Sequence, residues 1–223
     1  MTRLFLDSAD RDALARWLPL GPFHGVTTNP TILARAGLPC TVEAIGAIAA
    51  HAFAHGAREM QAQAWGGTRE AYLATGRALA ALDGRMVVKL PATEPGIAAA
   101  GTLLEEGARV TLTAVYAPHQ ALTARAMGVH YVAPYFGRMR DAGIDAVAAV
   151  RDMLAIAGDG PRVLVASLRS LDDLATLAAR GADTFTFGPD IAGALVAEPA
   201  TLEATMRFER DAGGSASPTI PSA

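Results

Sequence analysis

The 223-residue sequence is poor in cysteine, in excess charge and in long apolar segments, and each shortage excludes a class of protein. Cys40 is its only cysteine, so a disulfide framework is excluded. The formal net charge is −3, without the basic excess that is typical of nucleic-acid-binding domains. The most apolar stretch, residues 38–57, is interrupted by Glu43, His51 and His55, so no membrane span is expected. We expect a globular protein without nucleic-acid or membrane partners.

A targeting signal is also missing from the beginning of the sequence. The run MTRLFLDSAD enters a strand-like pattern directly and lacks the long apolar stretch of a signal peptide. The lone cysteine fits a reducing compartment. We therefore expect a cytoplasmic location.

What the sequence does contain is an alternation of strand-like and helical patterns. The strand-like runs are rich in Val, Leu, Phe and Thr and cover 3–8, 24–29, 59–65, 86–92, 109–115, 130–136, 162–168 and 184–189. The helical patterns cover 9–18, 41–56, 68–82, 94–106, 118–127, 142–157, 170–180 and 190–197, and a further helix is expected at 199–211. Because parallel strands are joined by covering helices, this alternation predicts a parallel sheet.

Two α/β folds are built on such a sheet, the (β/α)₈ TIM barrel and the doubly wound open sheet. Eight units fit the barrel, whose usual length is about 250 residues. An open sheet that binds a dinucleotide is expected to carry a glycine-rich loop after its first strand, but the run RLFLDSADRD has no glycine. We predict a single barrel domain over residues 1–211 with an additional C-terminal helix. The Gly-, Ser- and Pro-rich segment 212–223 is expected to be a disordered tail.

Polar side chains gather at the ends of the strand-like runs. A barrel carries its chemistry at the carboxyl ends of its strands, and side chains two residues apart share a face. Seven of the eight runs end in polar groups, which are Asp7, Thr27 with Asn29, Gln61 with Gln63, Lys89, Thr111 with Thr113, Tyr135 with Arg138, and Ser167 with Arg169. The eighth run offers only Thr184 and Thr186. This convergence predicts a reactive site at one end of the barrel.

Lys89 is the only lysine among the 19 basic residues, and it lies inside the apolar run MVVKLP. A lysine at a strand end ordinarily extends its amine to water. A charged ammonium is expensive to bury, however, whereas a neutral amine is a nucleophile that forms Schiff bases with carbonyl substrates. The hydroxyls and the carboxylate expected nearby favour this second role.

The other strand-end residues have two interpretations each. Asp7 is either the N-cap of the first helix or a carboxylate that orients substrate hydroxyls and moves protons. Thr27 and Asn29 either form a turn before Pro30 or contact the substrate. Tyr135 is either a packed ring with a solvated tip or a general acid and base.

Arg138, Ser167 and Arg169 suggest a phosphate site. The loops after the last two strands of barrels often bind phosphate, and the arginine fork matches its geometry, although arginines at strand ends are often only surface charges. No metal site is expected, because His51 and His55 lack the intervening glutamate and the third ligand of a zinc motif.

Six segments of the chain resemble the small transaldolase / fructose-6-phosphate aldolase family in sequence and in order. They are LFLDSA, GVTTNPTIL, VVKLPAT, TLTAVY, YVAPYFGR and VASLR. The resemblance implies a class I aldolase barrel that needs no cofactor and assembles as a pentamer or decamer, with Lys89 as the Schiff-base lysine on the fourth strand. It further implies site roles for Asp7, Thr27, Asn29 and Thr113, and phosphate-binding roles for Arg138, Ser167 and Arg169.

Two positions distinguish the branches of this family. Transaldolases carry a glutamate on the third strand and a phenylalanine in the sixth-strand motif, whereas this sequence has Gln63 and Tyr135, as in the aldolases. Thr111 departs from both branches. The resemblance therefore implies reversible cleavage with a dihydroxyacetone donor unit and a phosphorylated aldehyde acceptor. The alternatives are a transaldolase, which transfers the dihydroxyacetone unit from fructose 6-phosphate or sedoheptulose 7-phosphate, and a non-catalytic barrel that binds a sugar phosphate.

Overall fold

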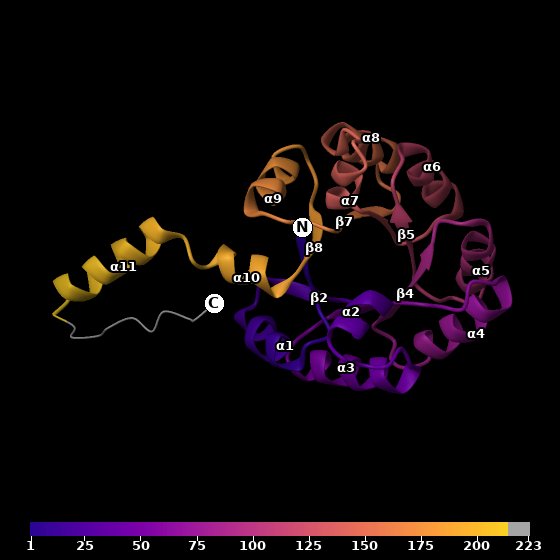
Figure 1. Ribbon diagram of the computed structural model, residues 1–223, viewed down its shortest axis with the longest axis horizontal. Coiled ribbons are helices and arrows are strands. Elements are labelled where there is room, and N and C mark those ends of the chain that lie inside the picture. The colour runs from indigo at the N-terminus through magenta and orange to yellow at the C-terminus, as the bar shows by residue number, and fades with distance from the viewer. Residues whose placement is uncertain (214–223) are drawn as a thin grey trace.

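Eight parallel strands pair in chain order and close into a barrel, as Figure 1 shows for the computed structural model. The structure describes residues 1–213. The strands are β1 (Arg3–Asp7), β2 (Phe23–Thr27), β3 (Glu59–Gln63), β4 (Met86–Pro91), β5 (Val110–Val115), β6 (Tyr131–Pro134), β7 (Arg162–Val165) and β8 (Thr184–Phe187). The barrel closes where β1 pairs with β8. The predicted TIM barrel is confirmed.

Helices surround the barrel. They are α1 (Arg11–Trp17), α2 (Pro30–Arg35), α3 (Val42–Ala54), α4 (Arg69–Ala80), α5 (Glu94–Glu105), α6 (Pro118–Met127), α7 (Phe136–Asp141), α8 (Ala146–Ala157), α9 (Leu171–Ala178), α10 (Pro189–Leu195) and α11 (Pro199–Asp211), with a 3₁₀ turn η1 (Leu18–Leu20). None of these described helices is long and apolar enough to cross a membrane.

The apolar side chains form two cores because they alternate between the two faces of each strand. The larger core fills the space between the sheet and the helices. The smaller core lies inside the barrel and consists of Phe5, Val87, Tyr131, Ala133 and Leu164. The inner core occupies only part of the barrel, and polar layers lie on either side of it.

Several helices begin where the sequence predicts. Thr68 and Ser170 accept hydrogen bonds from the backbone N–H groups of Ala71 and Asp173, which are otherwise without a partner in the first turn. Asp10 caps α1 in the same way, so the interpretation of Asp7 as that cap is wrong.

Two helices, α2 and α7, were not predicted, and a third, α8, begins later than expected. The segment predicted as one helix at 142–157 begins at Ala146, because Gly143 adopts a positive φ of 73° and Asp145 then starts a new cap. The preceding run, 130–136, ends as a strand at Pro134 and continues as the short helix α7. The turn expected after β2 is the start of α2, with Asn29 as its cap and Pro30 in its first turn.

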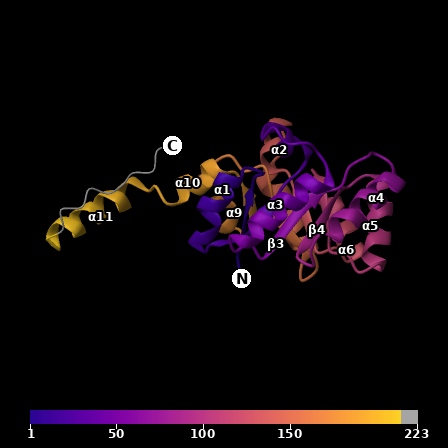
Figure 2. The same cartoon turned by 90° about the horizontal axis from the view of Figure 1, so that it is seen from below.

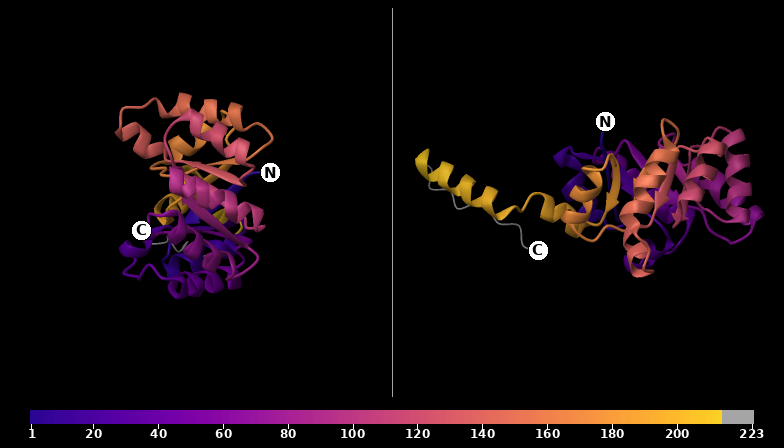
Figure 3. Two further views of the ribbon diagram at one scale, coloured as in Figure 1. Left: turned by 90° about the vertical axis from the view of Figure 1, so that its right-hand side faces the viewer. Right: turned by 90° about the horizontal axis from the view of Figure 1, so that it is seen from above.

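The additional C-terminal helix is also confirmed, and it extends away from the barrel. Figures 1, 2 and 3 show α11 standing clear of the strands beyond α10. No residue of α11 is buried, and the side chain of Phe208 is 66% exposed. The predicted disordered tail at 212–223 lies outside the described residues, except for Ala212 and Gly213.

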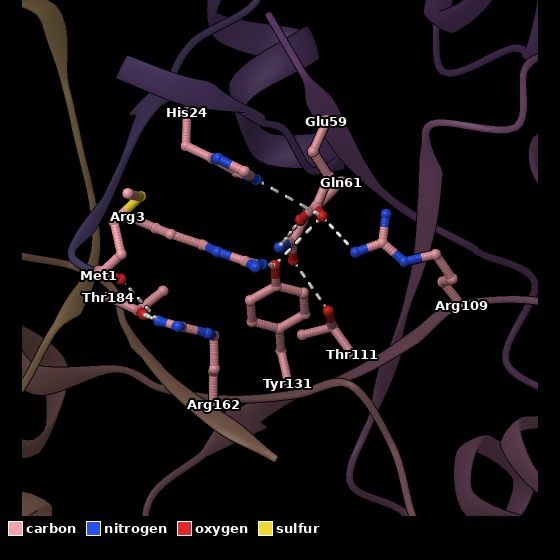
Figure 4. A network of polar contacts seen from close by, with 10 residues as sticks. All are labelled: Met1, Arg3, His24, Glu59, Gln61, Arg109, Thr111, Tyr131, Arg162 and Thr184. Carbon is pink, nitrogen blue, oxygen red and sulfur yellow. Dashed lines mark hydrogen bonds and ion pairs between the residues drawn. The ribbon is translucent and has the colours of Figure 1, made fainter. Parts of the chain in front are cut away.

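The amino end of the barrel is occupied by a network of charged and polar side chains centred on Glu59 (Figure 4). The Glu59 carboxylate is buried, and it accepts hydrogen bonds from Arg109, from Gln61 at 2.9 Å and from Tyr131 at 3.1 Å. Arg3 donates to the Tyr131 hydroxyl from the other side.

Electrostatics explain how a carboxylate persists at this depth. Burial by itself would raise the pKa of Glu59, but the neighbouring His24 ring and Arg109 guanidinium hold it at about 2. Burial and the adjacent Glu59 charge raise the pKa of Tyr131 to about 12, so its hydroxyl keeps its proton and can donate it to the carboxylate. This network lies at the amino end of the barrel, where the strands begin.

Candidate active site

The strand-end residues singled out from the sequence lie at the carboxyl end of the barrel. Asp7, Thr27 and Gln63 are the last residues of β1, β2 and β3. Asp7 is the register partner of Thr27, and Gln63 is the register partner of Lys89. Figure 2 shows α2, which follows β2, and the amino terminus at opposite ends of the barrel.

Lys89 lies on β4 with only 2% of its surface exposed. It follows Val87 at a spacing of two residues, and Val87 belongs to the inner core, so the Lys89 side chain also faces the interior of the barrel. On the two flanking strands its register partners are Gln63 and Thr111. The single amine side chain of the protein is therefore placed inside the barrel, among polar groups.

Asp7 is held by a chain of hydroxyl groups. The Thr27 hydroxyl donates a hydrogen bond to Asp7 Oδ1, and Thr27 Oγ1 lies 2.6 Å from Thr186 Oγ1 on β8. Both threonines are buried. Burial raises the pKa of the Asp7 carboxyl, and the nearby Lys89 charge and the Thr27 hydrogen bond oppose this increase only in part. A carboxyl in this setting binds a proton more readily than one at the surface, which suits it to proton transfer.

Tyr135 is fixed by contacts on several sides. The Thr113 hydroxyl donates to Tyr135 Oη at 3.0 Å. The Tyr116 ring packs edge-on at 5.8 Å between centroids, and Arg138 Cζ lies 4.8 Å from the Tyr135 ring centroid. Ala114, which follows Thr113, has a positive φ of 56° that is rare for a non-glycine residue. The ring is therefore packed and its hydroxyl positioned, which is compatible with both predicted interpretations of Tyr135.

Arg138, Ser167 and Arg169 are brought together by a close approach between α7 and the loop after β7. Gly137 makes this approach possible, because a Cβ atom there would lie 2.3 Å from the Ser167 carbonyl oxygen and 2.9 Å from Arg169 Nε. Ser167 itself has a positive φ of 62°, a strained conformation of the kind found at functional sites. Arg169 is held in place by a bidentate ion pair with Asp141 at the end of α7.

Asn29 fulfils the first of its two predicted roles, at the turn before Pro30. Its Oδ1 atom accepts a hydrogen bond from Ile32 N at 3.1 Å and so caps α2. The Nδ2 group is not used by this cap and can donate to a ligand. Asn29 is thus a structural residue whose second functional group is placed two residues beyond Thr27, at the mouth of the barrel.

Gln61 and Thr111, which the sequence placed with the strand ends, lie deeper. The Thr111 hydroxyl donates to Gln61 Oε1 at 2.8 Å, and Gln61 in turn donates to Glu59. Gln61 therefore belongs to the amino-end network and not to the mouth, whereas Thr111 connects this network to β4, where it is the register partner of Lys89.

Two residues join the site that sequence reasoning did not select, Thr186 and Tyr116. Thr186 was noted only as a polar residue of the last strand, and its contact with Thr27 depends on closure of the barrel between β8 and β1. Tyr116 directly follows β5, a position from which a side chain can reach the mouth. Among residues 1–213, no group of three or more His, Cys, Asp and Glu side chains is arranged to hold a metal ion.

A closed parallel barrel with an interior lysine and a ring of polar residues at the carboxyl ends of its strands defines a TIM-barrel enzyme. The family described as Transaldolase/Fructose-6-phosphate aldolase matches residues 4–217. The chain belongs to this family and is an enzyme of the aldolase or transferase kind, which replaces the alternative of a non-catalytic barrel.

Curated relatives match the chain over nearly its whole length. A protein of Caulobacter sp. (strain K31) named "Probable transaldolase" is 35% identical over 216 residues, which cover 96% of this chain and 97% of the relative. Proteins of the same name from Roseobacter denitrificans and Kosmotoga olearia are 32% and 35% identical, and each match covers 94% of this chain and 95% of the relative.

Proposed function

We propose that the chain is a class I aldolase that reversibly cleaves a phosphorylated ketose into dihydroxyacetone and a phosphorylated aldehyde, as fructose-6-phosphate aldolases do. The observation that carries the proposal is the buried amine of Lys89 inside the barrel, close enough to Asp7 to affect the pKa of that carboxyl. An amine in such a site is suited to form an imine with a ketone.

The reaction begins when the Lys89 amine attacks the substrate ketone and forms a carbinolamine, which loses water to give a protonated imine. The imine draws electrons from the C3–C4 bond as the C4 hydroxyl gives up its proton. That bond breaks, the phosphorylated aldehyde leaves, and the three-carbon unit remains on the lysine as an enamine. Protonation of the enamine at carbon and hydrolysis of the imine release dihydroxyacetone and restore the amine.

The proton transfers are assigned to the groups around the imine. Tyr135 has a phenolic hydroxyl that accepts from Thr113 and keeps its own proton to donate toward the reacting carbon. Asp7, whose pKa is raised by burial, exchanges protons with the substrate hydroxyls. Gln63 or Thr113 holds the water that hydrolyses the imine.

The remaining residues bind the two ends of the substrate. Asn29, through its Nδ2 group, and Ser167 hold the hydroxyls of the dihydroxyacetone unit, while Thr27 keeps Asp7 in place. Arg138 and Arg169 bind the terminal phosphate. The ion pair of Arg169 with Asp141 supports this assignment, because it fixes the guanidinium before the substrate arrives.

The second candidate function is that of a transaldolase, and the names of the relatives favour it. A transaldolase passes the enamine-bound unit to an acceptor aldehyde and releases little dihydroxyacetone. Gln63 and Tyr135 favour the aldolase, because a phenol near the imine can donate a proton to the enamine and free the product.

The experiment that separates the two functions measures free dihydroxyacetone formed from fructose 6-phosphate alone. We expect sustained release, with one dihydroxyacetone for each glyceraldehyde 3-phosphate formed. Erythrose 4-phosphate is added in a parallel reaction. Turnover that appears only when this acceptor is present would contradict the aldolase and establish the transaldolase.

We also propose that the protein is a homo-oligomer, a pentamer or decamer by its resemblance to the family, in which α11 packs against a second copy. Phe208 on this helix is 66% exposed, and within residues 1–213 no residue of the helix is buried against the barrel. The double variant Met206→Asp/Phe208→Asp is expected to sediment as a smaller species, whereas the control Thr201→Asp keeps the wild-type size. A monomeric wild type would contradict the proposal.

A further inference from the structure

A cavity lies at the amino end of the barrel, on the face opposite the candidate active site. Its volume is about 440 Å³, which falls within the range of small-molecule pockets. The cavity is lined by Arg3, Arg109, Arg125, Gly128, Val129, His130, Tyr131, Gly160, Pro161 and Arg162. Figure 4 shows Arg3, Arg109 and Arg162 around the first residues of the strands.

The lining of this cavity is strongly basic. Four arginines reach it from separate elements: Arg3 begins β1, Arg109 precedes β5, Arg125 lies on α6 and Arg162 begins β7. No aspartate or glutamate is among the lining residues. Three of the four guanidiniums nevertheless face a carboxylate of a residue outside the lining. Arg109 faces Glu59, Arg162 faces Asp183 at 2.9 Å, and Arg125 faces Asp159 at 3.9 Å.

Arg3 is the exception among the four arginines. Its guanidinium donates to the neutral hydroxyl of Tyr131, and no ion pair within 4.0 Å joins it to a carboxylate in residues 1–213. The Arg3 side chain is only partly exposed, so water screens its charge incompletely. The Glu59 carboxylate lies beyond the Tyr131 hydroxyl, so within residues 1–213 Arg3 has no direct carboxylate partner and keeps N–H donors for an anionic ligand.

His130 adds a polar group to the wall. Its Nδ1 atom accepts from Val110 N at 3.4 Å, which leaves the proton on Nε2 in the neutral ring. Burial lowers the pKa of His130, and the Arg109 charge lowers it further. The cavity thus offers guanidinium and imidazole N–H donors.

We propose that this cavity binds a phosphate group, either free or carried by a small phosphomonoester. Phosphate has two negative charges and three or more acceptor oxygens, which match guanidinium forks arriving from several directions. The volume is larger than phosphate itself requires, which leaves room for a metabolite attached to it. The site does not share a residue with the candidate active site at the carboxyl end.

Equilibrium dialysis of the full chain with radiolabelled inorganic phosphate tests the proposal. We expect a saturable site that persists in Arg138→Gln, which removes a phosphate ligand at the opposite mouth. In that same background, Arg3→Gln is expected to weaken the site about tenfold or more, the effect of losing a charge-assisted hydrogen bond. Arg125→Gln, at the exposed rim, is expected to weaken phosphate binding as well. This second variant tests the proposal even if Arg3→Gln does not fold.

Arg151→Gln serves as the charge-matched control, because Arg151 is exposed on α8, pairs with Asp152 and does not line the cavity. This variant is expected to bind phosphate as the wild type does. Competition with glycerol 3-phosphate then distinguishes the source of the phosphate group: stronger competition than by unlabelled phosphate identifies a phosphomonoester, and weaker competition identifies free phosphate.

The proposal is overturned by either of two results. One is that Arg138→Gln abolishes all saturable phosphate binding, which would mean that the wild type binds phosphate only at the mouth of the barrel. The other is that Arg3→Gln and Arg125→Gln lower the affinity for phosphate no more than Arg151→Gln does. The loss of affinity would then come from the lower net charge alone.

Discussion

Lys89→Met is expected to lower kcat/KM for fructose 6-phosphate cleavage by a factor of about 10⁴ or more, because no other lysine exists to form the imine. Methionine keeps most of the length of the lysine side chain without its amine, and it is at home in a buried position. The wild type, reduced with borohydride in the presence of dihydroxyacetone, is expected to gain one covalent adduct at Lys89. Mass spectrometry of the intact chain and of its peptides measures that adduct.

The control for this variant is its stability. Lys89 is 2% exposed, so removal of its amine is expected to leave the urea midpoint unchanged or to raise it. A variant that is folded, inactive and free of the adduct supports the imine mechanism. Retained activity in folded Lys89→Met, or a wild type that gains no adduct, would mean that the lysine is not the nucleophile.

Tyr135→Phe is expected to lower the rate of dihydroxyacetone release by a factor of about 10² or more, the usual contribution of a positioned proton donor. The ring still packs against Tyr116 and Arg138, so its position is kept and only the hydroxyl is lost. Transfer of the three-carbon unit to erythrose 4-phosphate is expected to fall less, because the enamine can react with an aldehyde without first being protonated. The ratio of release to transfer, measured in the same reaction mixture, is the quantity to compare.

Tyr116→Phe is the matched control, since it removes the same atom from the ring next to Tyr135. It is expected to change the ratio of release to transfer much less than Tyr135→Phe does. Equal effects of the two variants, or an unchanged ratio in Tyr135→Phe, would show that the Tyr135 hydroxyl does not protonate the enamine.

The sequence predicts the barrel and the position of Lys89 because both depend on local patterns. Most strands are short runs rich in Val, Leu, Phe and Thr, and alternation along β4 places Lys89 on the same face as Val87. The caps at Thr68 and Ser170 are equally local, since a side chain there bonds to an N–H group three residues later.

Contacts between distant strands lie beyond such patterns. Glu59 and Arg109 are 50 residues apart, and the sequence offers no signal that they meet inside the barrel. The same holds for Thr186 and Thr27, whose hydroxyls approach only after the last strand has paired with the first. The depth of Gln61 was misjudged for a related reason: alternation gives the face of a residue but not its layer.

The short helices α2 and α7 were also missed. Each has only six residues, too few for the spacing of apolar positions to show a helical period. The proposed phosphate site of Arg138, Ser167 and Arg169 depends on the second of them, because α7 brings Gly137 against the loop that carries Ser167. The sequence gives these residue types, but their proximity follows from the tertiary packing.

The seclusion of the only lysine side chain has a practical consequence for chemical labelling. Lys89 is almost completely enclosed, and every other basic side chain that can be charged at high pH is a guanidinium. Reagents that cross-link or tag lysine side chains therefore have no target on the outer surface. Side-chain labelling by a small amine-selective reagent becomes a direct measure of access to the barrel interior, and a cross-linking test of the proposed oligomer calls for reagents that react with carboxylates or arginine.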